Sequence, residues 1–266
     1  MAIHPDPEGH RRRVPARRRR GRRRRALPRK ARFSPWRWLA VIFIAAIALL
    51  GILPVGLVRV FDPPRTAFMI AAAQAAHARG DQNFEIDYRP RTLAAISPWA
   101  ALAVITAEDQ KFPDHRGFDL DAIQSALDAH RTGSRLRGAS TLSQQVAKNL
   151  FLWSGRSWLR KGLEAWYTLM LETLLSKRRI LELHLNIAEY GPGVYGVEAA
   201  AQRYFSCSAA DLDRHQAALL ASVLPNPLRY RLANPDATMR QRQAWILRHM
   251  QRLGGLTYLD RLGAND

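Results

Sequence analysis

One long apolar run dominates the hydrophobic pattern near the start of the chain. Residues 39–58 read LAVIFIAAIALLGILPVGLV, which is 20 residues without a charged side chain. A helix of about 20 apolar residues spans the hydrocarbon core of a membrane. Trp36 and Trp38 stand just before the run, as aromatic residues do at membrane interfaces. We therefore expect a transmembrane helix over residues 36–60, ended by the prolines at 63 and 64.

A cleaved signal peptide is the alternative interpretation of this run. The apolar region of a signal peptide has about 7–15 residues and is followed by a cleavage site of small residues. The run here is longer, and Leu57-Val58-Arg59-Val60 is a poor cleavage site. The pattern therefore favours an uncleaved membrane anchor.

Helical spacing of apolar residues prevails in the rest of the chain. A connector over 61–97 contains an Ala-rich helix at 66–78 and one weak strand candidate at 83–90. Beyond it we expect helices over 98–109, 119–130, 141–151, 158–175, 176–189, 197–204, 208–224 and 239–253, with loops at 132–134 and 191–196. The first of these helices is apolar nearly all round, so it should be buried. Because the strand–helix alternation of a doubly wound sheet is missing, residues 98–266 are predicted to form one mostly α domain.

Positive charge is concentrated before the apolar run. Of the 41 Lys and Arg residues, 15 lie in residues 1–37, against only Asp6 and Glu8, so the net charge of +19 divides into +13 and +6. This low-complexity segment cannot bury a core, and we expect a disordered tail over residues 1–35. Arginine-rich flanks stay in the cytoplasm and attract anionic lipid. No aromatic interleaving or recognition motif accompanies the arginines, so we expect no nucleic-acid partner.

Several kinds of chemistry have no support in the sequence. Cys207 is the only cysteine, so no disulfide can form within the chain. A structural zinc site lacks the paired cysteines or the HExxH motif that it needs. P-loop, hydrolase-elbow and penicillin-binding serine chemistry lack their motifs as well. We assign no metal ligand and expect no required cofactor.

Glu108 is the first candidate for catalysis. It ends the very apolar helix and is followed by Asp109. A carboxyl group at the mouth of an apolar pocket has its pKa raised toward neutrality, which suits a general base. The alternative is that Glu108 or Asp109 caps a helix or pairs with Lys111.

Cations and a second glutamate follow at helical spacing. Gln145 and Lys148 share one helical face, where an amide and an ammonium group can hold a phosphate or a sugar hydroxyl. Arg156 and Lys161 flank a helix start, a place that favours anions unless a bound phosphate compensates. Glu164 can pair with Lys161 three residues earlier. Ordinary surface charge is the alternative interpretation for each of these side chains.

Taken together, these segments resemble the bacterial peptidoglycan glycosyltransferase family, glycosyltransferase family 51. The resemblance covers roughly residues 98–235 and rests on five motifs: Glu108-Asp109 with Phe112 and His115-Arg116-Gly117-Phe118-Asp119; Gly138-Ala139-Ser140-Thr141-Leu142-Ser143-Gln144-Gln145 with Lys148-Asn149; Arg160-Lys161 with Glu164; Lys177, Ile180-Leu181-Glu182, Leu185-Asn186, Gly191, Gly196 and Tyr204-Phe205; and Ala217, Leu219-Leu220-Ala221, Pro225 and Tyr230. His184 departs from the usual Tyr, and we expect it to change packing more than chemistry.

The resemblance implies a lysozyme-like, mostly helical, two-lobed domain behind one N-terminal transmembrane helix. The chain stops about 30 residues after Pro235 without a transpeptidase domain, so it resembles the monofunctional, membrane-anchored type. The implied activity is polymerisation of lipid II into β-1,4 glycan strands with inversion and release of undecaprenyl pyrophosphate.

The resemblance also implies roles for individual residues. Glu108 would be the base, and Glu164 would orient the substrate or a divalent ion, Mg²⁺ or Mn²⁺. The groups implied to bind substrate and pyrophosphate are Lys148, Arg156, Lys161, Ser140, Gln145 and Asn149. Asp109, Phe112 and His115 would support them.

Location and partners follow from the same resemblance. The chain would be a single-pass protein of the bacterial inner membrane, with a cytoplasmic N-terminus and an extracytoplasmic catalytic domain. Its partners would be lipid II, the nascent glycan chain, membrane lipid, and proteins of cell-wall synthesis or division.

Three rival interpretations compete with this one. A lytic transglycosylase or lysozyme-like hydrolase is also helical and Glu-dependent, but it needs no pyrophosphate site such as Lys148, Arg156 and Lys161 provide. A non-catalytic scaffold would not need Glu108 and Glu164 intact. An Arg-rich nucleic-acid-binding membrane protein would explain the tail and nothing after it.

Overall fold

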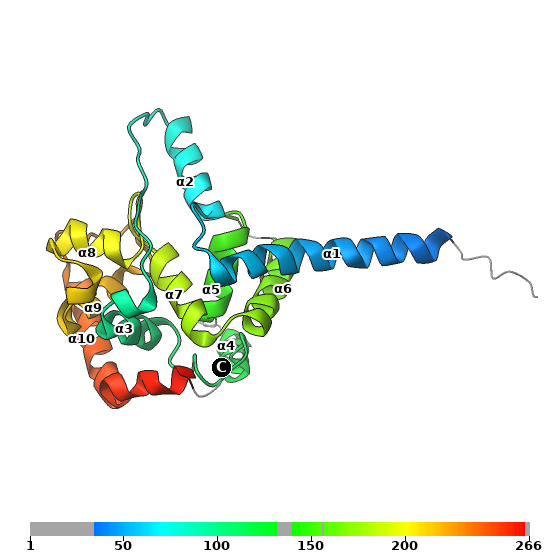
Figure 1. Cartoon of the computed structure of the whole chain (residues 1–266). Helices are drawn as coiled ribbons and strands as arrows, with labels where there is room; N and C mark the ends of the chain where they lie inside the picture. Colours follow the sequence, from blue (N-terminus) through cyan, green and yellow to red (C-terminus); the bar gives the residue numbers. More distant parts are fainter. Residues whose placement is uncertain (1–34, 132–139, 156, 264–266) are drawn as a thin grey trace, which may run out of the picture. The chain divides into compact units, whose positions relative to one another are not determined.

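The computed structural model describes residues 35–131, 140–155 and 157–263 of the chain, and these are mostly helical (Figure 1). Three predicted features lie outside the described residues: the Arg-rich tail up to residue 34, the loop at 132–134, and Arg156. Contacts divide the chain into one unit that ends at Ile42 and a second unit that begins at Phe43. The fold and the site below belong to the second unit.

The predicted membrane anchor is a single helix, α1 (Pro35–Val60). Its segment Trp36–Val60 is long and apolar enough to cross a membrane. Near its end, Val55 and Val58 are buried against the rest of the second unit. Arg179 donates hydrogen bonds to the carbonyl oxygens of Val58 at 3.0 Å and Phe61 at 3.1 Å. The end of the anchor is therefore bound directly to the domain.

The connector contributes structure to the domain. Its helix α2 (Ala67–Ala78) begins at Thr66, whose hydroxyl accepts a hydrogen bond from the Met69 N–H at 3.2 Å, as an N-cap residue does. Helix α2 packs against helix α5. Beyond it come strand β1 (Asp87–Tyr88) and a short 3-10 helix, η1 (Leu93–Ala95). The predicted strand at 83–90 thus shrinks to two residues.

A small sheet joins the connector to the body of the domain. Its order is β1-β3-β2, with β3 (Val194–Tyr195) parallel to β1 and antiparallel to β2 (Glu189–Gly191). The predicted helix up to residue 189 and the predicted loop at 191–196 were wrong there, because strands of two or three residues show no alternation of apolar and polar positions. A Cβ atom at Gly193, where φ is 74°, would lie 2.6 Å from the Glu85 carbonyl oxygen. Only glycine lets the two segments approach so closely.

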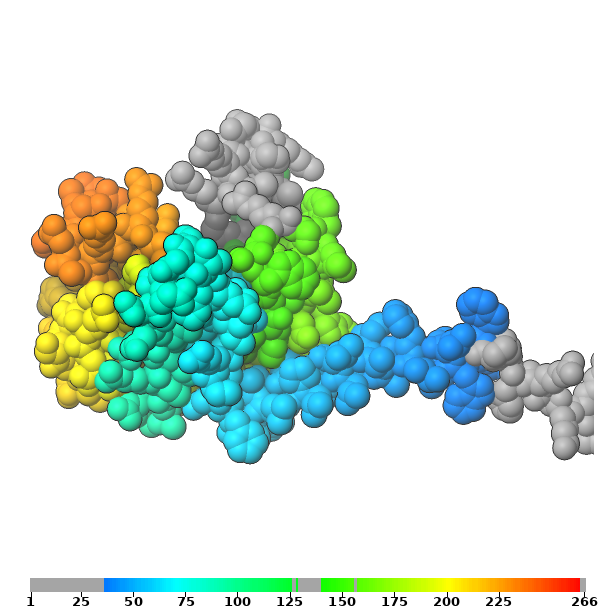
Figure 2. Space-filling view, turned by 90° about the horizontal axis from the view of Figure 1, so that it is seen from above, coloured from blue at the N-terminus to red at the C-terminus, as the bar shows by residue number. Residues whose placement is uncertain are grey.

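The helices form two groups, as the two-lobed prediction requires. One group packs α3 (Pro98–Glu108) against α9 (Arg214–Val223) and α10 (Ala237–Arg252), with α8 (Val197–Phe205) beside α9. The other contains α5 (Leu142–Phe151) and α6 (Trp158–Leu174). Helix α7 (Lys177–Ile187) contacts α3 and α8 of the first group and α5 and α6 of the second (Figure 1). In Figure 2 the cyan surface of α2 and the connector lies between the green surface and the yellow and orange surface.

Most predicted helices are confirmed, and the predicted helix at 208–224 was wrong in detail. The range 208–224 is not one helix but a 3-10 turn, η2 (Ala209–Asp211), followed by α9. Asp213 separates them because its carboxylate accepts from the N–H groups of His215 at 2.7 Å and Gln216 at 2.8 Å and so starts a new helix. Helix α4 (Leu120–Arg131) follows the prediction, whereas the 3-10 helix η3 (Gly255–Gly263) was not expected.

Helix α3 is the buried element that carries Glu108. Every residue from Ala100 to Thr106 is buried, because α9, α10, α7 and η3 all pack against this helix. Packing on all these sides explains why nearly every residue of this helix is apolar. The helix ends at Glu108, so the buried stretch from Ala100 to Thr106 sets the position of that carboxylate.

Candidate active site

Glu108 is held between the two groups of helices. Its side chain is 14% exposed. From α5, Gln145 Nε2 donates to Glu108 Oε2 at 3.0 Å. From α10, Arg242 Nη2 donates to Glu108 Oε1 at 3.2 Å. Each carboxylate oxygen thus has one donor, and the donors come from opposite groups.

Burial raises the pKa of the Glu108 carboxyl group. The hydrogen bond from Gln145 and the charges of Arg242 and Lys148 oppose this shift without cancelling it. Arg242 and Gln145 favour the ionised carboxylate, while burial makes this carboxylate accept a proton more readily than an exposed one. A partly buried carboxylate in this balance is suited to general-base chemistry.

Asp109 anchors the segment that follows α3. Both of its carboxylate oxygens lie 3.0 Å from His115 Nε2, and one accepts from the Leu142 N–H at 3.0 Å. His115 Nδ1 accepts from the Gly117 N–H at 3.2 Å, so the ring hydrogen lies on Nε2. Asp109 thereby ties the end of α3 to the start of α5. The supporting role of Asp109 and His115 stays a prediction.

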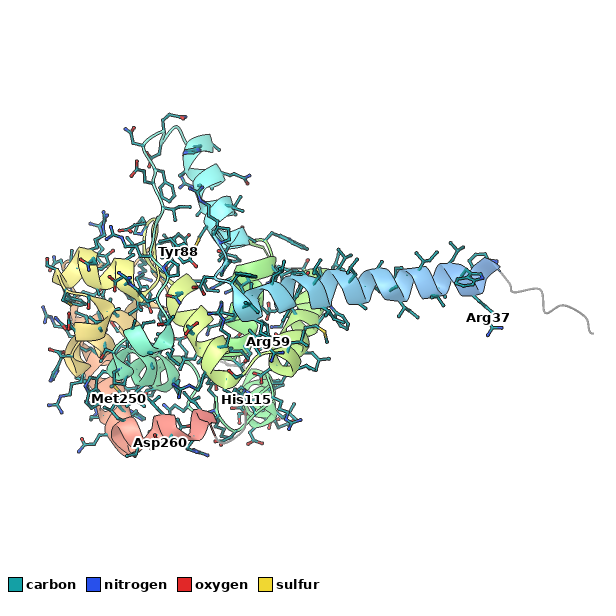
Figure 3. The ribbon with its side chains drawn as sticks, viewed as in Figure 1. Arg37, Arg59, Tyr88, His115, Met250 and Asp260 are labelled. Atoms are coloured by element: carbon teal, nitrogen blue, oxygen red, sulfur yellow. The ribbon has the colours of Figure 1, made fainter. Side chains whose placement is uncertain are left out.

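Phe112 is fully buried beneath this segment. Lys177 Nζ lies 4.5 Å from the centre of its ring and donates to the His115 carbonyl oxygen at 2.6 Å and to Glu172 at 2.8 Å. Phe112 therefore contributes packing rather than a reacting group. His115, labelled in Figure 3, lies in the segment that this lysine fixes.

Lys148 lies on α5, where the charges of both candidate glutamates act on it. The pKa of Lys148 is lowered, mainly by burial. The negative charges of Glu164 and Glu108 oppose this shift, and the positive charges of Arg160 and Lys161 add to it. Its Nζ lies 5.4 Å from the centre of the Phe68 ring on α2. Within the described part of the chain, Lys148 makes no direct ion pair. A half-buried ammonium group of this kind is ready to bind an anion.

Glu164 is buried, with 3% of the residue exposed, and both of its oxygens are occupied. Arg160 Nη1 donates to Oε2 at 2.9 Å, and Lys161 Nζ donates to Oε1. The expected pairing with Lys161 is therefore present. Arg160, whose side chain is 12% exposed against 49% for Lys161, is the partner that the sequence analysis did not assign.

The other predicted binding residues are placed less completely. A cavity of about 220 Å³ beside Glu108 is lined by Ser140, with Asp109, Gln110, Lys111, Asp119, Ala122 and Thr141. Thr141 caps α5, which leaves the exposed Ser140 facing this space. Asn149 follows Lys148 on α5 and is partly buried. Ser140 and Glu108 therefore share one opening.

Two contacts near Glu108 were not predicted from the sequence. Arg242 lies 134 residues away along the chain, and no motif marks it. His184 was expected to affect packing, but its Nε2 lies 3.0 Å from Gln145 Oε1. The only sign in the sequence was that His184 replaces the usual Tyr. That difference did not indicate a hydrogen bond to Gln145.

A metal ion fits poorly at Glu164. An arginine and a lysine already donate to its two oxygens, and the described residues contain no group of three His, Cys, Asp or Glu that could hold a metal. A divalent cation near Glu164 stays a prediction, and no step below depends on it.

The fold and the site together define a helical enzyme that places one carboxylate of raised pKa beside a cluster of cations. Residues 79–251 match the Transglycosylase family model, and with this match the chain belongs to that family. Three relatives share the description "Biosynthetic peptidoglycan transglycosylase". The protein of Xylella fastidiosa (strain 9a5c) is 51% identical over 226 residues, 85% of this chain and 93% of the relative. The protein of Citrobacter koseri is 55% identical over 225 residues, 84% and 89% of the two chains, and that of Shigella boydii serotype 4 is 54% identical over 223 residues, 83% and 88%.

Proposed function

We propose that this chain polymerises lipid II into β-1,4 glycan strands and releases undecaprenyl pyrophosphate, as an enzyme of bacterial cell-wall synthesis. The family match and the names of the relatives support polymerisation. The observation that carries the proposal is Lys148, which is partly buried on α5 one helical turn after Gln145, the residue that donates to Glu108. The charges of Glu108 and Glu164 both act on this ammonium group. A glycan-cleaving enzyme has no pyrophosphate leaving group to neutralise, so it needs no ammonium group at this position. An enzyme that releases pyrophosphate does need one.

Glu108 acts on the acceptor. It takes the proton from the 4-hydroxyl of the acceptor sugar as that oxygen attacks the anomeric carbon of the donor chain. The new C–O bond forms while the bond to pyrophosphate breaks on the opposite face, so an α-linked donor gives a β-linked product in one displacement. The raised pKa of Glu108 lets this carboxylate hold the proton that it receives.

The cations act on the leaving group. Lys148, Lys161 and Arg156 neutralise the charge that develops on the pyrophosphate, a form of stabilisation that is often the largest single contribution to catalysis. Glu164 keeps Lys161 and Arg160 in place and orients the substrate. Ser140, Gln145 and Asn149 hold the donor.

The membrane anchor places this chemistry where a lipid-linked substrate diffuses. The single apolar helix α1 is suited to a single-pass anchor. We place the arginine-rich N-terminus in the cytoplasm and the catalytic domain on the outer side of the inner membrane, because positive flanks are retained inside. Membrane lipid and the nascent glycan chain are then its immediate surroundings, and proteins of cell-wall synthesis or division are the partners we expect.

Polymerisation of purified lipid II by the purified full-length protein tests the proposal. We expect glycan polymer from the wild type and a loss of about 10²–10⁴-fold with Glu108→Gln, because the variant has no base. Release of soluble fragments from preformed glycan, without polymer from lipid II, would instead support the lytic alternative. A Glu108→Gln variant that polymerises at the wild-type rate would remove Glu108 from the mechanism.

A further inference from the structure

A buried histidine ends a hydrogen-bonded chain that begins at Glu108. His184 lies on α7 with 1% of its surface exposed, and its Nε2 is 3.0 Å from Gln145 Oε1. The Nε2 atom of the same Gln145 side chain lies 3.0 Å from Glu108 Oε2. Three elements, α7, α5 and α3, are thus joined by two hydrogen bonds through one amide group. Among the described residues, His184 Nδ1 has no hydrogen-bond partner.

The protonation of His184 decides how this amide is oriented. Burial lowers the pKa of His184 to about 3, and the charge of Lys148 acts in the same direction. The ring is therefore neutral at physiological pH and carries one hydrogen, on either Nε2 or Nδ1. With the hydrogen on Nε2, the ring donates to the Gln145 oxygen and the amide NH₂ faces Glu108. With the hydrogen on Nδ1, Nε2 would need a donor, the amide would turn round, and its oxygen would face the carboxylate.

We propose that His184 is a positioning residue for Glu108: its Nε2–H fixes the Gln145 amide so that a donor stays on the carboxylate that acts as base. The proposal rests on the proposed function, since it requires Glu108 to be the base. An ionised carboxylate repels a carbonyl oxygen and attracts an N–H, so the Nε2–H form is the one that suits the ionised state of Glu108. Besides holding the donor, Gln145 is then held by His184 and itself holds Glu108.

The other charged and titratable groups around Glu108 do not replace this donor. Arg242 on α10 binds the opposite oxygen, Oε1. Lys148 on α5 acts on Glu108 only through charge. Among the described residues, the buried Tyr190 hydroxyl on β2 makes no hydrogen bond, so it donates nothing to Glu108. In the described part of the chain, Gln145 is the one donor to Oε2. If the amide turns freely, Glu108 loses that hydrogen bond and binds its proton more tightly.

Two polar variants of His184 form a matched pair for the test. In His184→Gln the side-chain amide nitrogen lies as many bonds from the backbone as Nε2 does in histidine, so the donor to Gln145 is retained. In His184→Asn the amide nitrogen takes the place of Nδ1, so that donor is lost. His184→Leu removes both nitrogens and keeps an apolar side chain. All three are measured in the full-length protein with lipid II, together with Glu108→Gln.

The decisive measurement is kcat/KM for polymerisation as a function of pH. The rate falls on the acid side as Glu108 becomes protonated. We expect His184→Asn and His184→Leu to move this acid limb to higher pH and to lower kcat on the order of tenfold, the effect of a lost hydrogen bond to a charged group, with KM changed little. His184→Gln should restore both the wild-type limb and kcat.

Three outcomes would overturn the proposal. One is an acid limb that stays at the wild-type pH in both His184→Asn and His184→Leu. The second is an equal loss in His184→Gln and His184→Asn, because only a packing role treats the two alike. The third is a Glu108→Gln variant with wild-type activity, which would also remove the proposed base. If His184→Leu does not fold, the Gln and Asn pair still decides the question.

Discussion

At the residue scale, the site depends on how each carboxylate is neutralised. Glu108 is balanced between burial, which favours the protonated form, and the donors Gln145 and Arg242, which favour the ionised form. Glu164 is instead paired with Arg160 and Lys161. In the proposed mechanism these two glutamates therefore have different tasks: Glu108 accepts a proton, and Glu164 holds cations beside the pyrophosphate.

Arg242 should control the pH at which Glu108 works. In Arg242→Ala the positive charge beside Oε1 disappears, so the pKa of Glu108 rises further above its ordinary value. The acid limb of kcat/KM for lipid II polymerisation should then move to higher pH. Arg240→Ala, an exposed arginine on the same helix, is the matched control and should leave the profile unchanged. An Arg242→Ala profile that coincides with that of the Arg240 variant would contradict this account.

Replacing Glu108 should not destabilise the protein. A carboxyl group whose pKa is raised on folding binds its proton more tightly in the folded state. Its contribution to stability is therefore lost as pH rises from the unfolded pKa through the raised folded pKa. At neutral pH Glu108→Gln should melt at or above the wild-type temperature, as measured by circular dichroism. A clear drop in the melting temperature would mean that the ionised carboxylate stabilises the fold.

At the element scale, long helices could be predicted and short strands could not. Helices such as α3 and α6 show apolar spacing over ten or more residues, which is why their ranges in the sequence analysis nearly match the structure. Strands β2 and β3 have three and two residues and exist because β1 from the connector completes the sheet. The same limit applied to the site: Glu164 and Lys161 are neighbours on one helix, whereas Arg242 reaches Glu108 only through packing of α10 against α3.

Gly193 tests whether the small sheet matters for stability. Alanine there meets the Glu85 carbonyl oxygen and must adopt a positive φ. We expect Gly193→Ala to lower the free energy of unfolding by about 1–3 kcal/mol, measured by chemical denaturation. In the control, Gly162→Ala on α6, the added Cβ meets no atom within 4 Å and should be neutral or stabilise by about 1 kcal/mol. Equal effects of the two changes would show that the contact at Gly193 is unimportant.

At the scale of the whole molecule, the membrane anchor and the catalytic domain meet at Arg179. Besides its bonds to the end of α1, this side chain pairs with Asp62 at 2.9 Å and with Glu182 on its own helix. Arg179 therefore links the anchor to α7, the helix that contacts both groups and carries His184. No pattern in the sequence indicated this link, because its partners include backbone carbonyl groups more than 110 residues away along the chain.

Removing this link should loosen the anchor from the domain. Arg179→Ala deletes several hydrogen bonds made by a charged group, and each contributes about 1.5–3 kcal/mol. We expect a lower melting temperature and faster proteolysis within the connector at residues 61–66. Arg178→Ala, an exposed neighbour, should change neither. Unchanged proteolysis in Arg179→Ala would show that other contacts hold α1 in place.

The bond between Arg179 and the carbonyl oxygens of Val58 and Phe61 has a mechanical consequence. Because Arg179 lies on α7, a force on the end of α1 passes directly to the helix that contacts both groups of helices. Without these two bonds, the force would pass first through the connector.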